Sequence, residues 1–348
     1  MRLTTLTALT ALTLGFTASM SAGAMAETLR ISTFVPPNHA FNRALAAWGE
    51  ELSEATSGEL TVEIFPAGQL GPPPRQFDLV RSGGADISVI LNGATPGRFP
   101  MTELAGLPLT HPSAGLDSAI TSRRLTELAP EYLAGEYEGT RILWMAVTPP
   151  LKIHLSSVDP SNLENLQGLR IRYAGTTWQQ ILEALGASPV PVPPAEAADA
   201  MSRGVVDGAS FPFEATMSFD LAPVSEYSLE PGLASATFAV IMGDDAYNRL
   251  TPEHQALIDS TTGPDRAEWF GMMWDEGEAH GRQYMVDAGV NIVTMDAAQI
   301  TSMTEAFSGI VSESIDAVGG DAAGFVAAYT EQPDCGPPIP GGPHPVEP

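Results

Sequence analysis

A segment in the middle of the chain alternates strand-like and helix-like patterns, and this alternation constrains the fold more than any other feature. Residues 166–212 read LQGLRIRYAGTTWQQILEALGASPVPVPPAEAADAMSRGVVDGASFP. The apolar residues that recur at the spacing of one helix face are Trp178, Ile181, Leu182 and Leu185. Short apolar runs bounded by glycine and proline lie on both sides of this helix. Such alternation is typical of a parallel sheet covered by helices.

The same alternation occurs once before in the chain. The earlier copy opens with LRIS at 29–32 and closes with GADIS at 84–88, and the later copy opens with LRIR at 169–172 and closes with VDGAS at 206–210. Two copies predict two α/β lobes that face each other. Ligands of open parallel sheets bind beyond the carboxyl ends of the strands, so we expect a ligand site between the lobes.

We expect the chain to cross between the lobes more than once. A strand-like run at 236–242 returns it to the first lobe after the second copy of the unit. The predicted division is 1–26 signal peptide, 27–148 plus 236–264 first lobe, 149–235 plus 265–330 second lobe, and 331–348 a Pro/Gly-rich tail.

The amino terminus has the pattern of a secretory signal. Arg2 is its only charge, residues 6–20 are mainly apolar, and Ala24-Met25-Ala26 provides a small-residue cleavage site. A membrane anchor is the alternative, but the apolar run is short and is interrupted by Thr, Gly and Ser. We therefore predict an exported protein that is cleaved after Ala26 and is not inserted in the membrane.

The charge of the chain excludes several kinds of partner. Its 42 acidic residues outnumber 16 Lys and Arg, which gives a formal net charge of -26. Such a chain repels nucleic acids and anionic lipid surfaces. The single cysteine, Cys335, cannot form an intramolecular disulfide. We expect no nucleic-acid partner.

Sequence motifs for catalysis or metal binding are missing. The six histidines are scattered, and no G-x-S-x-G, H-E-x-x-H, P-loop or G-x-G-x-x-G motif occurs in a usable context. We therefore predict no catalytic residues, no metal ligands and no cofactor. An exported hydrolase remains the alternative from another functional class, because a Ser/His/Asp triad has no fixed sequence signature.

Arg172 is the first candidate for ligand binding. It lies where a predicted strand hands over to a helix, and a helix start offers unpaired N–H groups and a partial positive charge. A guanidinium added there makes a seat for a carboxylate. The alternative is a surface ion pair, because strand alternation places Arg170 and Arg172 on one face.

Four stretches of the sequence carry a family resemblance. LQGLRIR followed by LGASPVPVPPAEAADAMSRGVVDG resembles the solute-binding proteins of TRAP transporters, the DctP-like family. The segments LRISTFVPPNHAFNRALAAWGEEL and IFPAGQLGPPPRQFDLVRSGGADIS are similar to the same family, so the resemblance covers about residues 28–330. An ABC-type or tripartite-tricarboxylate-type receptor is the alternative among binding proteins, and the motif spacing argues against both.

The resemblance implies a type II-like periplasmic binding protein fold. Two lobes with parallel or mixed sheets, joined by a hinge, close on a small organic carboxylate in the periplasm. A long helix crosses both lobes, and residues 265–287 are its counterpart here. The implied partners are a small and a large permease subunit in the membrane.

The resemblance also implies roles for individual residues. Arg172 forms a salt bridge with the ligand carboxylate. Phe211 stands where many members have Asn, so this position favours an apolar part of the ligand, with core packing as the alternative. The hinge strand 145–150 lacks the second arginine of some members, and Lys152 is the nearest cation. We therefore expect a monocarboxylate.

Four further residues complete the predicted site. Asn92 follows a first-lobe strand and is a candidate hydrogen-bonding partner of the ligand, although Asn-Gly turns are common. Phe34 and His39 lie in the first strand-to-helix turn, where a capping or structural role for the histidine is the alternative. Trp178 either faces the cleft or belongs to the core.

Overall fold

The structure is a computed structural model that describes residues 26–108 and 117–331. The predicted tail with Cys335, and the predicted signal peptide up to Met25, lie outside these residues. The strands are β1 (Glu27–Ser32), β2 (Leu60–Phe65), β3 (Ile87–Leu91), β4 (Thr140–Val147), β5 (Lys152–Leu155), β6 (Arg170–Tyr173), β7 (Ser188–Pro191), β8 (Gly208–Phe211), β9 (Tyr227–Glu230), β10 (Thr237–Gly243) and β11 (Asn291–Thr294).

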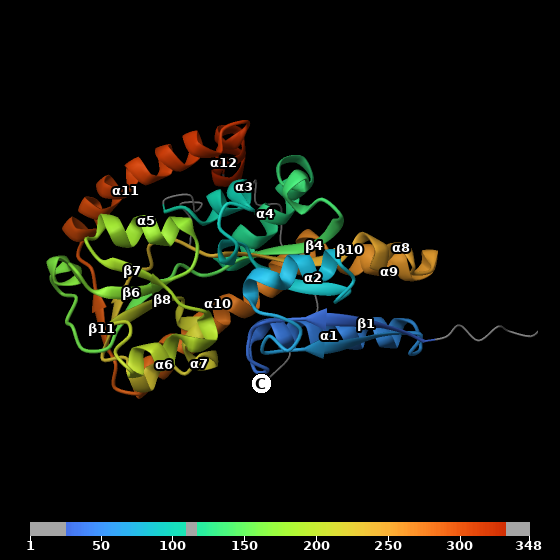
Figure 1. Ribbon diagram of the computed structural model, residues 1–348, viewed down its shortest axis with the longest axis horizontal. Helices are drawn as coiled ribbons and strands as arrows, with labels where there is room; N and C mark the ends of the chain where they lie inside the picture. The colour runs from blue at the N-terminus through green and yellow to red at the C-terminus, as the bar shows by residue number, and fades with distance from the viewer. Residues whose placement is uncertain (1–25, 109–116, 332–348) are drawn as a thin grey trace, which may run out of the picture.

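Helices cover these strands and connect them (Figure 1). They are α1 (Ala40–Ala55), α2 (Gln76–Arg81), α3 (Pro100–Glu103), α4 (Ser118–Tyr132), α5 (Thr176–Ala184), α6 (Ala197–Ser202), α7 (Phe213–Ser218), α8 (Asp244–Asn248), α9 (Pro252–Thr261), α10 (Pro264–Asp287), α11 (Ala297–Val318) and α12 (Ala322–Thr330).

The strands form two mixed sheets with related topology. The first sheet has the order β2-β1-β3-β10-β4, and the second has the order β11-β9-β5-β8-β6-β7. In each sheet one repeated unit supplies three parallel strands: β1 pairs with β2 and β3, and β6 pairs with β7 and β8. An antiparallel strand then follows in each, β10 beside β3 and β5 beside β8. The prediction of a two-lobed α/β fold with mixed sheets is confirmed.

Helix α5 shows how the local sequence sets up the second unit. Its buried face consists of Trp178, Ile181 and Leu182, as the spacing predicts, and Gly186 follows its end with a φ of 75°. The helix starts after Gly175, which has a φ of 89° and is its N-cap. Only glycine adopts that conformation without strain.

Two short connections join the sheets and form the hinge. One runs from β4 to β5, and the other runs from β9 to β10. They are tied together by backbone hydrogen bonds: Thr148 N donates to Ala236 O at 3.0 Å, and Leu151 N donates to Ala234 O at 2.8 Å. The two connections therefore run side by side as a paired backbone segment between the sheets.

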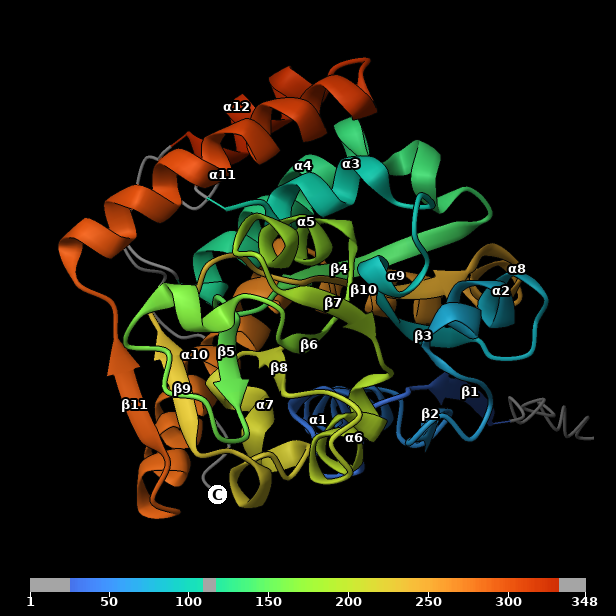
Figure 2. The same ribbon diagram turned by 60° about the vertical axis from the view of Figure 1, so that its left-hand side comes forward.

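Helix α10 crosses the molecule from one sheet to the other (Figures 1 and 2). Trp269, Phe270 and Trp274 in its first half pack into the core of the first sheet. Met285 near its end packs with Phe213 in the second lobe. The predicted cross-lobe helix is confirmed.

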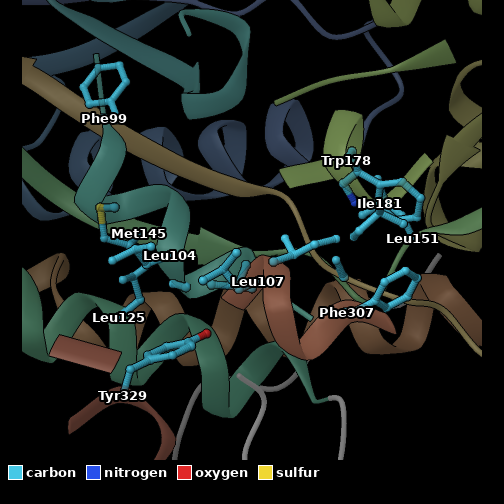
Figure 3. Packing of buried hydrophobic residues seen from close by; sticks show 14 of the residues in the cluster. Phe99, Leu104, Leu107, Leu125, Met145, Leu151, Trp178, Ile181, Phe307 and Tyr329 are labelled. Carbon is cyan, nitrogen blue, oxygen red and sulfur yellow. The ribbon is translucent and has the colours of Figure 1, made fainter. Parts of the chain in front are cut away.

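The two C-terminal helices lie over both lobes. Helix α11 contacts α5, and α12 contacts α4 (Figure 2). One core cluster contains residues from both lobes, with Trp178 and Ile181 near Leu151 and Phe307 (Figure 3). Helix α10 contacts both α4 and α7, and α12 contacts both α4 and α11, so these helices do not belong to one lobe alone. The lobe boundaries given from the sequence stay a prediction.

Candidate ligand-binding site

A cavity lies where the two lobes and the hinge meet. Its lining includes Phe34 and His39 from the turn after β1, Phe238 from β10, Arg172 and Phe211 from β6 and β8, Glu214 from α7 and Trp274 from α10. The space that the centre of a water molecule can occupy is about 50 Å³. One water needs roughly 10–15 Å³ of such space, so the cavity fits a compact ligand better than an extended one.

Arg172 is the cationic group of this cavity. Its side chain is 2% exposed, and burial lowers its pKa to about 9, which leaves it charged at neutral pH. Its Nε donates to Val192 O and its Nη1 donates to Ser210 O, both at 3.0 Å. These carbonyls fix the guanidinium and do not neutralise it.

No acidic side chain of residues 26–108 or 117–331 forms an ion pair with Arg172. Arg170, two residues earlier, pairs with Asp207 at 2.7 Å and is exposed. The surface ion pair that the sequence left open is therefore the role of Arg170. A buried charge without a partner costs several kcal/mol, which a bound anion offsets.

Aromatic rings form the walls of the cavity. The Phe211 ring lies 4.2 Å from the Arg172 guanidinium carbon, in cation–π contact. Phe34 stacks on Phe238 with 6.3 Å between ring centroids. A flat apolar ligand fits such walls, and its carboxylate end can face the guanidinium.

His39 and Glu214 are the other polar groups of the lining. His39 caps α1, because its Nδ1 accepts the backbone N–H of Phe41 at 3.2 Å. Burial lowers the pKa of His39 to about 3, with a smaller contribution from Arg43, so the ring is neutral. Burial and the nearby charge of Glu278 raise the pKa of Glu214 to about 8.

Two predicted site residues do not line this cavity. Asn92 is buried in the short helix η2 (Asn92–Ala94), and its Nδ2 donates to Tyr137 Oη at 2.6 Å. Trp178 is 1% exposed and packs in the shared core cluster (Figure 3). Of the six predicted residues, the structure brings four to the cavity: Arg172, Phe211, Phe34 and His39.

Two other groups that could bind an anion already have acidic partners within the protein. Lys152, the nearest cation in the sequence, forms an ion pair with Glu278 on α10. The start of α5 is occupied as well, since Glu103 Oε2 accepts the backbone N–H of Thr176 at 3.3 Å. This N–H group of the α5 terminus is therefore already bonded, and a role of the terminus in seating the ligand stays a prediction.

Sequence reasoning missed Glu214, Phe238 and Trp274. Glu214 lies three residues after Phe211, so its position beside a predicted site residue was an available signal. Phe238 and Trp274 reach the cavity from the hinge strand and from the cross-lobe helix. Their residue types are those of core positions, so no local pattern separates them from the core.

Comparison with known proteins identifies the family. Residues 31–317 match the family model of DctP, described as bacterial extracellular solute-binding protein, family 7. The chain belongs to this family. Family 7 membership confirms the predicted resemblance and supports a TRAP-type receptor over the ABC-type and tripartite-tricarboxylate-type alternatives.

Individual family 7 relatives cover most of the chain. A solute-binding protein of Roseobacter denitrificans is 25% identical over 81% of this chain and 86% of its own length. A marine metagenome TRAP solute-binding protein specific for aromatic acid ligands, solved with 3-hydroxybenzoate, is 31% identical with a TM-score of 0.83, covering 88% of this chain and 98% of that one. One from Bordetella bronchiseptica with bound mandelate is 31% identical with a TM-score of 0.81, covering 87% and 98%.

The predicted role is confirmed at the level of the family: the protein is a TRAP-type periplasmic solute-binding protein. Within the described residues, every helix is too short or too polar to cross a bilayer.

Proposed function

We propose that this protein captures a small aromatic monocarboxylate between its lobes and delivers it to a TRAP permease. The observation that carries this proposal is the buried Arg172 guanidinium, which has no acidic partner among the described residues and lies over the Phe211 ring in an aromatic-walled cavity. The aromatic acids bound by two solved relatives support the ligand class.

A single carboxylate is proposed because one cation is available. Lys152 is committed to Glu278, so a second ligand carboxylate would meet no free partner in the lining described above. An unpaired carboxylate in a low-dielectric cavity costs several kcal/mol. The apolar walls disfavour hydroxyl-rich sugar acids for the same reason.

Closure of the lobes supplies the binding energy and the signal. Removing water from around the carboxylate strengthens its attraction to Arg172. Closing also changes the outer surface of the protein, so a permease with a small and a large subunit can distinguish the loaded form from the empty one. The ligand leaves chemically unchanged, and the protein acts as a receptor and not as an enzyme.

We also propose how the chain reaches its compartment. The predicted signal is removed after Ala26, and the mature chain starts at Glu27, directly at β1. The lobes that close are proposed to divide at the hinge, near 148–151 and 231–236.

The test compares two arginines of the same strand. Isothermal titration and thermal shift with benzoate, mandelate, succinate and galacturonate are measured for the wild type, Arg172→Gln and Arg170→Gln. We expect the wild type to bind the aromatic acids, Arg172→Gln to lose at least a hundredfold in affinity while its apo fold persists, and Arg170→Gln to bind normally. Unchanged affinity in Arg172→Gln contradicts the proposal. Recovery of a hydrolysed product instead of the ligand favours the hydrolase alternative.

A further inference from the structure

A second polar feature of the cavity lies apart from Arg172. His39 comes from the turn before α1 and Glu214 comes from α7, and their Nε2 and Oε1 atoms are 4.0 Å apart. Both side chains are more than nine-tenths buried and both line the cavity. The two lobes therefore present one polar group each to the same point.

The helix cap fixes which nitrogen of His39 carries the proton. Its Nδ1 accepts the N–H of Phe41, so in the neutral ring the proton is on Nε2. Nε2–H is thus a donor that faces Glu214. The Glu214 carboxyl has an acceptor oxygen whether or not it is ionised.

The separation of the two groups suits a single oxygen atom that bridges them from the side. A distance of 4.0 Å is too long for a hydrogen bond between Nε2 and Oε1. A hydroxyl oxygen to one side of the line that joins the two atoms can lie at hydrogen-bond distance from both, accepting from His39 Nε2–H and donating to Glu214. This donor–acceptor pair matches a hydroxyl, which has both capacities, better than a carbonyl or an amine.

The aromatic wall separates this pair from the anion seat. Phe211, which contacts Arg172, lies 5.4 Å from Phe219, and Phe219 lies 5.8 Å from His39, measured between ring centroids. A ligand carboxylate on Arg172 therefore places a different part of the ligand near His39 and Glu214.

We propose that His39 and Glu214 together bind a hydroxyl group on the ring of the aromatic acid, remote from its carboxylate. This specificity rests on the proposed function, because the ring must first be oriented by Arg172. The charges around Glu214 are those of Glu278 and Arg43, which oppose each other. His39 and Glu214 are therefore suited to bind an uncharged hydroxyl group, and the ligand needs no charge besides its carboxylate.

The experiment measures affinities for benzoate and its 2-, 3- and 4-hydroxy derivatives by titration calorimetry. We expect the wild type to bind 3- or 4-hydroxybenzoate about three- to tenfold tighter than benzoate, because one buried hydrogen-bonded hydroxyl is gained. 2-Hydroxybenzoate shows no such gain, because its hydroxyl lies beside the carboxylate.

Variants separate recognition from folding. Glu214→Leu removes the acceptor and is expected to bring the hydroxybenzoate-to-benzoate affinity ratio near one, whatever its effect on the absolute affinity for benzoate. Glu214→Gln keeps an acceptor and retains most of the preference. His39→Asn keeps a capping oxygen but is too short to reach the hydroxyl, so it loses the preference as well, and it replaces Glu214→Leu if that variant does not fold.

The outcomes distinguish the two proposals. Wild type that binds benzoate and every hydroxybenzoate equally overturns the hydroxyl site and leaves the proposed function standing. A preference that survives in both Glu214→Leu and His39→Asn also overturns it. Failure of the wild type to bind any of these acids overturns both the ligand class and the hydroxyl site.

Discussion

Gly93 and Gly175 touch across the gap between the lobes, and a Cβ atom on Gly93 would lie 2.6 Å from the Gly175 Cα. Gly93 belongs to η2 at the end of β3, and Gly175 is the N-cap of α5 in the second lobe. The atoms that an added methyl group would meet belong to the backbone of Gly175. They cannot move aside as the end of a flexible side chain can. This approach of the two lobes therefore requires a residue without a side chain at position 93.

Gly93→Ala is expected to hinder closure without unfolding either lobe. Because the added methyl group meets backbone, we predict a loss of about tenfold or more in ligand affinity and a more open shape in small-angle scattering. The apo melting temperature should stay near wild type. Gly135→Ala is the control, since a Cβ at Gly135 meets nothing within 4 Å. Equal affinities in the two variants would contradict a closing role for this contact.

Glu103 is expected to make the stability of the folded protein sensitive to pH. Burial, together with the charge of Glu136, raises its pKa from 4.5 to about 7, although the Thr176 N–H works in the opposite direction. A carboxyl whose pKa is raised by folding stabilises the folded form below its unfolded pKa, and this contribution is lost as the pH rises to about 7.

Glu103→Gln removes this titration and keeps an acceptor for Thr176. We predict equal stability of variant and wild type near pH 4.5 and a variant more stable by about 1–2 kcal/mol at pH 8, measured by urea unfolding. Glu313→Gln, on the exposed face of α11, serves as the control and should leave the profile unchanged. Parallel profiles for wild type and Glu103→Gln would refute the assignment.

The sequence was sufficient for the parts of the site that lie within one repeated unit. Arg172 and Phe211 belong to two strands of the second unit, whose order the alternating pattern already predicts. Phe238 and Trp274 join them only after β10 and α10 have crossed between the lobes, and that geometry depends on long-range packing. Local patterns carry no information about it.

The two predicted residues away from the cavity show the same limit. Asn92 lies at the end of β3 as expected, but its amide bonds to Tyr137, 45 residues further on. Trp178 has the spacing of a buried helix face. Whether that face borders the ligand cleft or the core depends on which residues cover it, and the spacing does not give this. The covering residues, Leu151 and Phe307 among them, come from the hinge and from α11 (Figure 3).

The buried His154 in β5 leads us to expect that acid lowers the stability of the folded protein. Its Nε2 lies 3.1 Å from Phe211 O, a carbonyl that only accepts, so the proton is on Nε2 and Nδ1 accepts from Ser228 Oγ at 2.8 Å. Burial lowers the pKa of this histidine from 6.5 to about 4. A depressed histidine pKa contributes stability above 6.5 that is lost as the pH falls toward 4.

His154→Gln retains a donor and an acceptor and does not titrate. We predict that the wild type loses about 2–3 kcal/mol more stability than the variant between pH 7 and pH 4, measured by urea unfolding at each pH. His39 also titrates with a lowered pKa, so its contribution is present in both proteins and cancels in the comparison. A steeper acid loss in the variant would contradict a neutral His154.

Gly281 allows α10 to lie against α7, the helix that carries Glu214. A Cβ at position 281 would collide with the carbonyl oxygen of Phe213, and α7 would have to move away. Gly281→Ala is therefore expected to destabilise the protein by about 2–3 kcal/mol in urea unfolding and to weaken ligand binding, because the shift displaces a cavity wall.

Gly309→Ala in α11 is the matched helical control: nothing lies within 4 Å of its Cβ, so it should stabilise by about 0.5–1 kcal/mol. If both substitutions change stability in the same direction, helix propensity outweighs packing at position 281 and the close approach of α10 and α7 is not tight.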